Sequence, residues 1–112
     1  MIQLNSENAM ISEIVEDILK VLPHFLNIHF YKKAINIALE KRNFYTKEGF
    51  IQIKYLDRHL GYIKMDQVVY NSNSETPELM IKYIKGSVTD EDLSIVKKFK
   101  EIYKCECLFI IY

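Results

Sequence analysis

Apolar residues in the first third of the chain recur at steps of three and four, the spacing of an amphipathic helix. This spacing predicts a helix from about Glu7 to Leu22, which Pro23 ends because proline cannot continue a helix. A second stripe predicts a helix from about Asn27 to Arg42. The first stripe consists of Ile11, Ile14, Val15, Ile18, Leu19 and Leu22, and the second of Tyr31, Ala34, Ile35, Ala38 and Leu39.

Helical spacing then gives way to an alternation of apolar and polar residues, which predicts strands. We expect a strand over Phe50 to Leu56, a turn at Asp57-Arg58-His59 and a returning strand over Leu60 to Tyr70. These two strands form a hairpin. The polar loop Asn71-Ser72-Asn73-Ser74 separates the hairpin from a third strand over Leu79 to Lys85.

The last third of the chain predicts one more helix and one more strand. Gly86 ends the third strand, and Thr89 or Asp90 caps a helix with the stripe Leu93, Val96, Phe99 and Tyr103. Cys107 to Tyr112 is apolar on both faces, as in a strand buried inside a sheet. The predicted order is helix, helix, three strands, helix, strand. The helix between the last two strands allows them to lie parallel, so we expect a single α/β domain with a mixed sheet.

The composition of the chain indicates which classes of partner and which cellular location to expect. The 112 residues suit one domain, and 15 Lys+Arg balance 15 Asp+Glu, so no net positive field draws the chain to nucleic acid. No run approaches the roughly 18 apolar residues of a membrane span, and the first residues lack the order of a signal peptide. We therefore expect a cytoplasmic or otherwise intracellular protein with no membrane partner.

The spacing of the two cysteines and three histidines does not predict a complete metal site. Cys105 and Cys107 are neighbours on one strand face, which is poor geometry for a disulfide, and alone they form half of a zinc site. We expect buried, reduced thiols. His24, His29 and His59 are predicted on a turn, a helix and a hairpin turn, with no spacing that would pair them as ligands.

The candidate residues for metal binding or catalysis are Asp66, Tyr83 and Lys85. Asp66 lies towards the end of the second strand, and the third strand carries Tyr83-Ile84-Lys85. Alternation places Tyr83 and Lys85 on the same strand face. Metal-dependent nucleases hold Mg²⁺ with such an Asp and with an acid-x-Lys strand, but here a phenol stands in the place of the second acid.

These residues resemble the small GxxExxY proteins, a branch of the PD-(D/E)xK nuclease-like superfamily, over about Ile14 to Tyr112. The resemblance implies a restriction-endonuclease-like core, a first metal-binding acid at Asp66 and a catalytic lysine at Lys85. The matching stretches are Tyr31-Lys32-Lys33-Ala34-Ile35, Leu60-Gly61-Tyr62-Ile63-Lys64-Met65-Asp66, Lys85-Gly86-Ser87-Val88-Thr89-Asp90-Glu91 and Leu108-Phe109-Ile110-Ile111-Tyr112.

The chain departs from the family pattern at positions where the family carries its motif and site residues. Ile28 stands in place of the motif Glu, Tyr83 in place of the second acid, and Ile95 where a Gln is usual. Mg²⁺ prefers carboxylate oxygens, and a phenol with a pKa of about 10 is neutral at pH 7. This pattern predicts an inactive nuclease-like domain, with no cofactor, in which Asp66 and Lys85 are a remnant. Asp66 is then expected to form an ion pair with Lys85 or Lys64.

Three functions follow from this interpretation. The first is a binding or scaffold module whose partner is a protein or a second copy, with nucleic acid less well supported. The second is an active Mg²⁺-dependent nuclease in which Asp66 and Glu78 hold the metal and Lys85 assists. The third is a small structural component, as in a virion. The basic residues Lys97, Lys98, Lys100 and Lys104 are expected on a solvated helix face rather than on phosphates.

Overall fold

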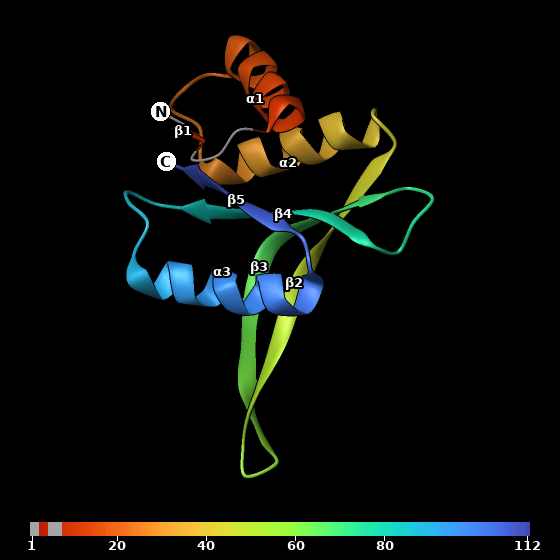
Figure 1. Cartoon of the computed structure of the whole chain (residues 1–112). Helices are drawn as coiled ribbons and strands as arrows, with labels where there is room; N and C mark the ends of the chain where they lie inside the picture. Colours follow the sequence, from red (N-terminus) through yellow and green to blue (C-terminus); the bar gives the residue numbers. More distant parts are fainter. Residues whose placement is uncertain (1–2, 5–7) are drawn as a thin grey trace.

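A mixed β-sheet lies between two helical layers (Figure 1). The structure is a computed structural model and describes residues 3–4 and 8–112. The sheet has the strand order β1-β5-β4-β3-β2. Its strands are β1 (Gln3–Leu4), β2 (Phe44–Tyr55), β3 (Arg58–Asn71), β4 (Pro77–Ile84) and β5 (Glu106–Ile111). Only the β4–β5 pair is parallel, and the other neighbours are antiparallel.

Each helix begins at a side-chain cap. The helices are α1 (Ala9–Val21), α2 (Ile28–Glu40) and α3 (Asp90–Tyr103). The Asn8 and Asn27 side chains accept backbone N–H groups at the starts of α1 and α2. Thr89 forms a capping box with Asp92 at the start of α3. Across the described residues, no helix combines the length and apolarity needed to cross a bilayer.

The strands place alternate side chains in two separate cores, one on each face of the sheet. Leu79, Ile81 and Tyr83 of β4 face α1 and α2 and pack with Ile11, Ile35 and Leu39. Met80 and Ile84 of the same strand face α3 and pack with Val96 and Phe99. The structure is thus a three-layer α/β/α domain, with α1 and α2 on one face and α3 on the other.

The predicted α/β class, single domain and order α-α-β-β-β-α-β are confirmed. The two-residue β1 is an additional strand that the sequence pattern did not predict. The first strand of the hairpin begins at Phe44 rather than Phe50, because the segment from 44 to 47 pairs with the buried end of β3. Glu7, the predicted start of the first helix, lies outside the described residues.

The β2–β3 hairpin continues beyond α3 as an arm (Figure 1). Every residue from 54 to 60 is exposed. The radius of gyration is 14.7 Å, whereas a compact domain of this length has about 13 Å. The predicted three-residue turn is wrong: Tyr55 pairs with Arg58, so Leu56 and Asp57 alone connect the strands. Both have positive φ, of 50° and 62°, as in a type I′ turn.

Helix α3 packs closely against the sheet because Gly49 has no side chain. A Cβ at Gly49 would lie 3.0 Å from Val68 Cγ2 and 3.1 Å from the Tyr103 hydroxyl oxygen. That hydroxyl oxygen accepts the backbone N–H of Phe50 at 3.3 Å. Phe99, one turn earlier on α3, is completely buried. The end of α3 is therefore anchored by an apolar ring and by one hydrogen bond to the edge strand β2.

Phe99→Ala should lower the free energy of unfolding by about 3–5 kcal/mol, because it removes a fully buried ring and leaves a cavity. Ile102→Ala on the same helix is the matched control, since Ile102 is exposed. We expect the control to change stability by less than about 1 kcal/mol. Urea denaturation followed by circular dichroism measures both, and equal losses would contradict the assigned packing of α3.

Candidate functional site

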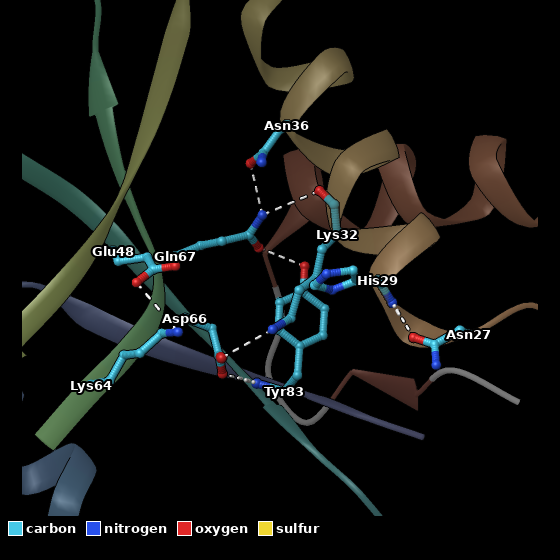
Figure 2. A network of polar contacts seen from close by, with 9 residues as sticks. All are labelled: Asn27, His29, Lys32, Asn36, Glu48, Lys64, Asp66, Gln67 and Tyr83. Carbon is cyan, nitrogen blue, oxygen red and sulfur yellow. Dashed lines mark hydrogen bonds and ion pairs between the residues drawn. The ribbon is translucent and has the colours of Figure 1, made fainter.

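A β-bulge in β3 brings two polar side chains to the same face of the sheet. Lys47 pairs with Val68, and Gly49 pairs with Met65, so the single residue Glu48 lies opposite both Asp66 and Gln67. Side chains normally alternate along a strand, but an extra residue interrupts the alternation. Asp66 and Gln67 both contact α2 as a result. Figure 2 shows them side by side beneath this helix.

Asp66 is bound through both of its carboxylate oxygens. Oδ1 lies 3.1 Å from Lys32 Nζ, and Oδ2 accepts the backbone N–H of Tyr83 at 2.9 Å. The Lys32 and Asp66 side chains are 27% and 21% exposed, so the ion pair is only partly screened by water. Lys32 Nζ also lies 4.8 Å from the centroid of the Tyr83 ring, within cation–π range. Asp66 therefore connects α2, β3 and β4.

Gln67 extends this network deeper into the protein. Its Oε1 accepts the Tyr83 hydroxyl at 2.5 Å, and its Nε2 donates to Asn36 Oδ1 at 2.7 Å and to the Lys32 carbonyl oxygen at 3.3 Å. Asn36 Oδ1 also accepts the Thr46 hydroxyl at 2.6 Å. Both ends of the buried Gln67 amide are hydrogen-bonded, which offsets the cost of removing it from water. We call Lys32, Asn36, Thr46, Asp66, Gln67 and Tyr83 the α2 network.

The phenol of Tyr83 stays protonated in this environment. Burial is the main reason why its pKa lies well above the ordinary value, and the nearby Asp66 charge raises it further. The hydrogen bond to Gln67 lowers the pKa by a smaller amount. Tyr83 is therefore a neutral hydrogen-bond donor and provides no anionic oxygen near pH 7.

A hollow of about 280 Å³ opens beside the α2 network, between α2 and the β2–β3 ribbon. Two of its lysine side chains are paired with carboxylates. Lys32 pairs with Asp66, and Lys64 pairs with Glu48 at 3.3 Å. Lys33 and Lys47 also line the hollow, so its charged side chains are predominantly cationic. The lining residues are His29, Lys32, Lys33, Asn36, Thr46, Lys47, Glu48, Lys64, Asp66 and Gln67.

The structure corrects the expected partner of Asp66. Lys85 lies beyond the end of β4 on the exposed surface, and Lys64 pairs with Glu48, so Lys32 takes the place of both. The prediction that Asp66 pairs with Lys85 or Lys64 is wrong. The sequence pattern did not identify Lys32 as the partner of Asp66, because Lys32 lies on a helix 34 residues earlier in the chain.

Glu78 is not brought to Asp66 either. Gln67, next to Asp66, pairs with Ile81, and Glu78 lies three residues before Ile81, about 10 Å along the strand. Glu78 is also exposed. The two carboxylates that the Mg²⁺-dependent alternative requires therefore lie too far apart to share one ion in this arrangement.

The donor set around Asp66 does not fit Mg²⁺. A single carboxylate is present, an ammonium group contacts it, and the nearby phenol is neutral and already bound to Gln67. Among residues 3–4 and 8–112, no group of three or more His, Cys, Asp or Glu side chains could hold a metal ion. Ile28, which stands in place of the motif acid, packs against the apolar cluster under α1 and α2 instead.

Other candidate residues lie away from the α2 network. Both cysteines are free thiols, but they are half-buried rather than buried as predicted. Burial raises the pKa of Cys107 to about 12, so its thiol is protonated near neutral pH. The His24 ring lies 3.2 Å from the Leu19 carbonyl oxygen, and the His59 ring lies 2.7 Å from Gln52 Nε2 on the arm. The histidines do not converge on one site.

Comparison of the chain with protein-family models, with curated proteins and with solved structures gives no match. The resemblance to GxxExxY proteins therefore remains a prediction from the residues quoted above.

Tyr83→Phe should lower the free energy of unfolding by about 1–3 kcal/mol. The variant keeps the ring but leaves the buried Oε1 of Gln67 without its donor. Tyr62→Phe is the matched control, because Tyr62 is exposed, and we expect a change within about 0.5 kcal/mol. Parallel urea denaturation curves at pH 7.5 measure both. Equal stability of the Tyr83→Phe variant and the parent chain would show that this hydrogen bond does not hold the network together.

Raising the pH should reduce the advantage of the parent chain over Tyr83→Phe. The pKa of Tyr83 is raised in the folded state, so its contribution is complete below the unfolded value, near 10, and is lost as pH rises above it. The difference in unfolding free energy should fall by up to about 1.4 kcal/mol per pH unit above about pH 10. Other titrating groups cancel because both proteins contain them. A difference that stays constant between pH 8 and 11 would contradict the assignment.

Proposed function

We propose that this chain is a non-catalytic binding domain of the PD-(D/E)xK nuclease-like type. The single observation that supports this most strongly is the state of Asp66, whose two oxygens are bound by Lys32 and by the Tyr83 backbone. In this proposal, the residues at the position of the metal site stabilise the fold and do not take part in hydrolysis. The α2 network then holds α2 on the sheet.

Electrostatics supports this proposal. A divalent cation at Asp66 would have to displace the Lys32 ammonium, which already lies 3.1 Å from the carboxylate, or to bind beside it against like-charge repulsion. Phosphodiester hydrolysis by metal-dependent nucleases relies on the ion to generate the nucleophile and to neutralise developing charge. The exposed Lys85 forms no ion pair with Asp66 or with another acid in the described part of the chain, so it does not replace these contributions.

The remaining surface favours a protein partner over nucleic acid. The chain has no net charge, which gives phosphate backbones no long-range attraction. Large apolar side chains are exposed instead on the β2–β3 hairpin and on all three helices, and they are most frequent on the hairpin. Exposed apolar side chains that gather on one element mark interaction sites.

The purified chain should show no plasmid nicking that depends on Mg²⁺ or Mn²⁺. Its melting temperature should also be unchanged by these ions, because a ligand that binds only the folded state would raise it. Asp66→Asn is the matched control, since it removes the charge but keeps the shape of the side chain. Nicking that requires the metal and disappears in Asp66→Asn would overturn the non-catalytic proposal.

A further inference from the structure

The tip of the arm exposes an apolar side chain where the backbone favours a polar one. Leu56 has a φ of 50°, in the left-handed region that Gly, Asn and Asp adopt more readily than Leu. It is 78% exposed, so the side chain supplies no packing within the chain. Tyr55, Leu60 and Tyr62 beside it are also exposed. A residue that opposes both its local conformation and its solvation indicates a contact outside the protomer.

An apolar groove of about 370 Å³ runs between α1 and α2. Its floor and walls are aliphatic, including Ile18, Val21 and Ile37, and both Val21 and Ile37 are largely exposed. Charged side chains stand at its rim. Arg42 pairs with Glu13, whereas Asp17 and Lys41 form no ion pair with another residue in the described part of the chain. The full lining is Ile14, Asp17, Ile18, Val21, Leu22, Ala34, Ile37, Ala38, Lys41 and Arg42.

We propose that the chain forms a two-fold homodimer in which the arm tip of each copy inserts Leu56 into the α1–α2 groove of the other. This inference rests on the proposed binding role and names the partner as a second copy. The two surfaces match in polarity, because an exposed aliphatic tip meets an aliphatic groove. They also match in charge: Asp57 of the tip can meet Lys41 at the rim, and Arg58 can meet Asp17.

The shape of the protomer favours exchange between copies. The arm projects from the body on the side opposite α1 and α2, so its tip points away from the groove of its own chain (Figure 1). Two copies placed side by side and pointing in opposite directions bring each tip to the helical layer of the other. Such an arrangement has two-fold symmetry and closes as a dimer, because the same two surfaces are used twice.

The extent of the two surfaces predicts a weak dimer. The exposed tip, residues 54 to 60, and the groove lining together supply about 17 residues on each copy. A standard specific interface has roughly 20–30 residues on each side. We therefore expect a dissociation constant in the micromolar range, on the order of 1–50 µM.

Sedimentation velocity between about 1 and about 100 µM of the whole chain should show a concentration-dependent dimer. Leu56→Asn should raise the dissociation constant on the order of a hundredfold, about tenfold for each of the two tips. Asn suits the left-handed turn, so this variant keeps its fold. Ile37→Glu should weaken association similarly from the groove side. Ile102→Gln, an exposed apolar position on α3, is the control and should dimerise like the parent chain.

Mixing the two variants distinguishes a dimer formed by arm exchange from a dimer formed through other surfaces. A heterodimer of Leu56→Asn with Ile37→Glu retains one intact contact, in which the natural tip of the Ile37→Glu copy enters the natural groove of the Leu56→Asn copy. Both changes fall on the other contact, where they remove the same packing of Leu56 in the groove and are therefore not additive. The mixture should thus dimerise about tenfold more tightly than either variant alone. The double variant carries both changes in every copy and should remain monomeric.

Three results would overturn the proposed exchange. The first is a parent chain that stays monomeric up to about 100 µM. The second is a dimer that tolerates either single variant, and the third is a mixture that dimerises no more tightly than either variant alone. Circular dichroism melting confirms that each variant is folded. None of these results depends on nuclease activity, so a monomeric chain would leave the non-catalytic proposal in place, and metal-dependent nicking would leave the dimer test unaffected.

Discussion

The bulge at Asp66 and Gln67 is the constraint on which the rest of the site depends. In a regular strand these neighbours would face opposite sides of the sheet, and one of them would lie in the apolar core beneath α3. The extra residue opposite Glu48 instead turns both toward α2. There the carboxylate meets Lys32, and the amide meets the Tyr83 phenol. The buried side-chain amide of Gln67 is therefore hydrogen-bonded at both its oxygen and its nitrogen.

Different interactions hold the helices on the two faces of the sheet. The face beneath α3 is apolar, and its close approach depends on the missing side chain of Gly49. The other face combines an apolar cluster with the α2 network. Hydrogen bonds add only modest net stability, but their directions restrict how α2 can rotate or slide. The network thus fixes the position of α2 more strongly than it raises the total stability of the fold.

Periodicity in the sequence was sufficient to predict the order of the helices and strands other than β1, and most of the faces that they bury. It did not reveal the bulge, because the adjacent polar residues Asp66 and Gln67 interrupt the alternation without showing which residue of β2 lies opposite them. Nor could it identify Lys32, which lies beside the apolar stripe of α2 and meets Asp66 only in the folded structure. The replacement of an acid by Tyr83 was visible in the sequence. Its consequence, a protonated phenol that donates to Gln67, required the tertiary arrangement.

The bulge also connects the α2 network with the arm. β3 runs without interruption from Gln67 to the arm tip at Arg58. A bulge bends a strand and increases its local twist, so the same irregularity that gathers the polar side chains also sets the direction in which the ribbon leaves the body. A second register shift, in which Ile53 pairs with Gly61 and Lys54 with His59, leaves Leu60 of β3 as an extra residue and adds another bend nearer the tip. Replacement of the bulged residues would therefore disturb the attachment of α2 and the direction of the arm together, although the tip lies far from the network.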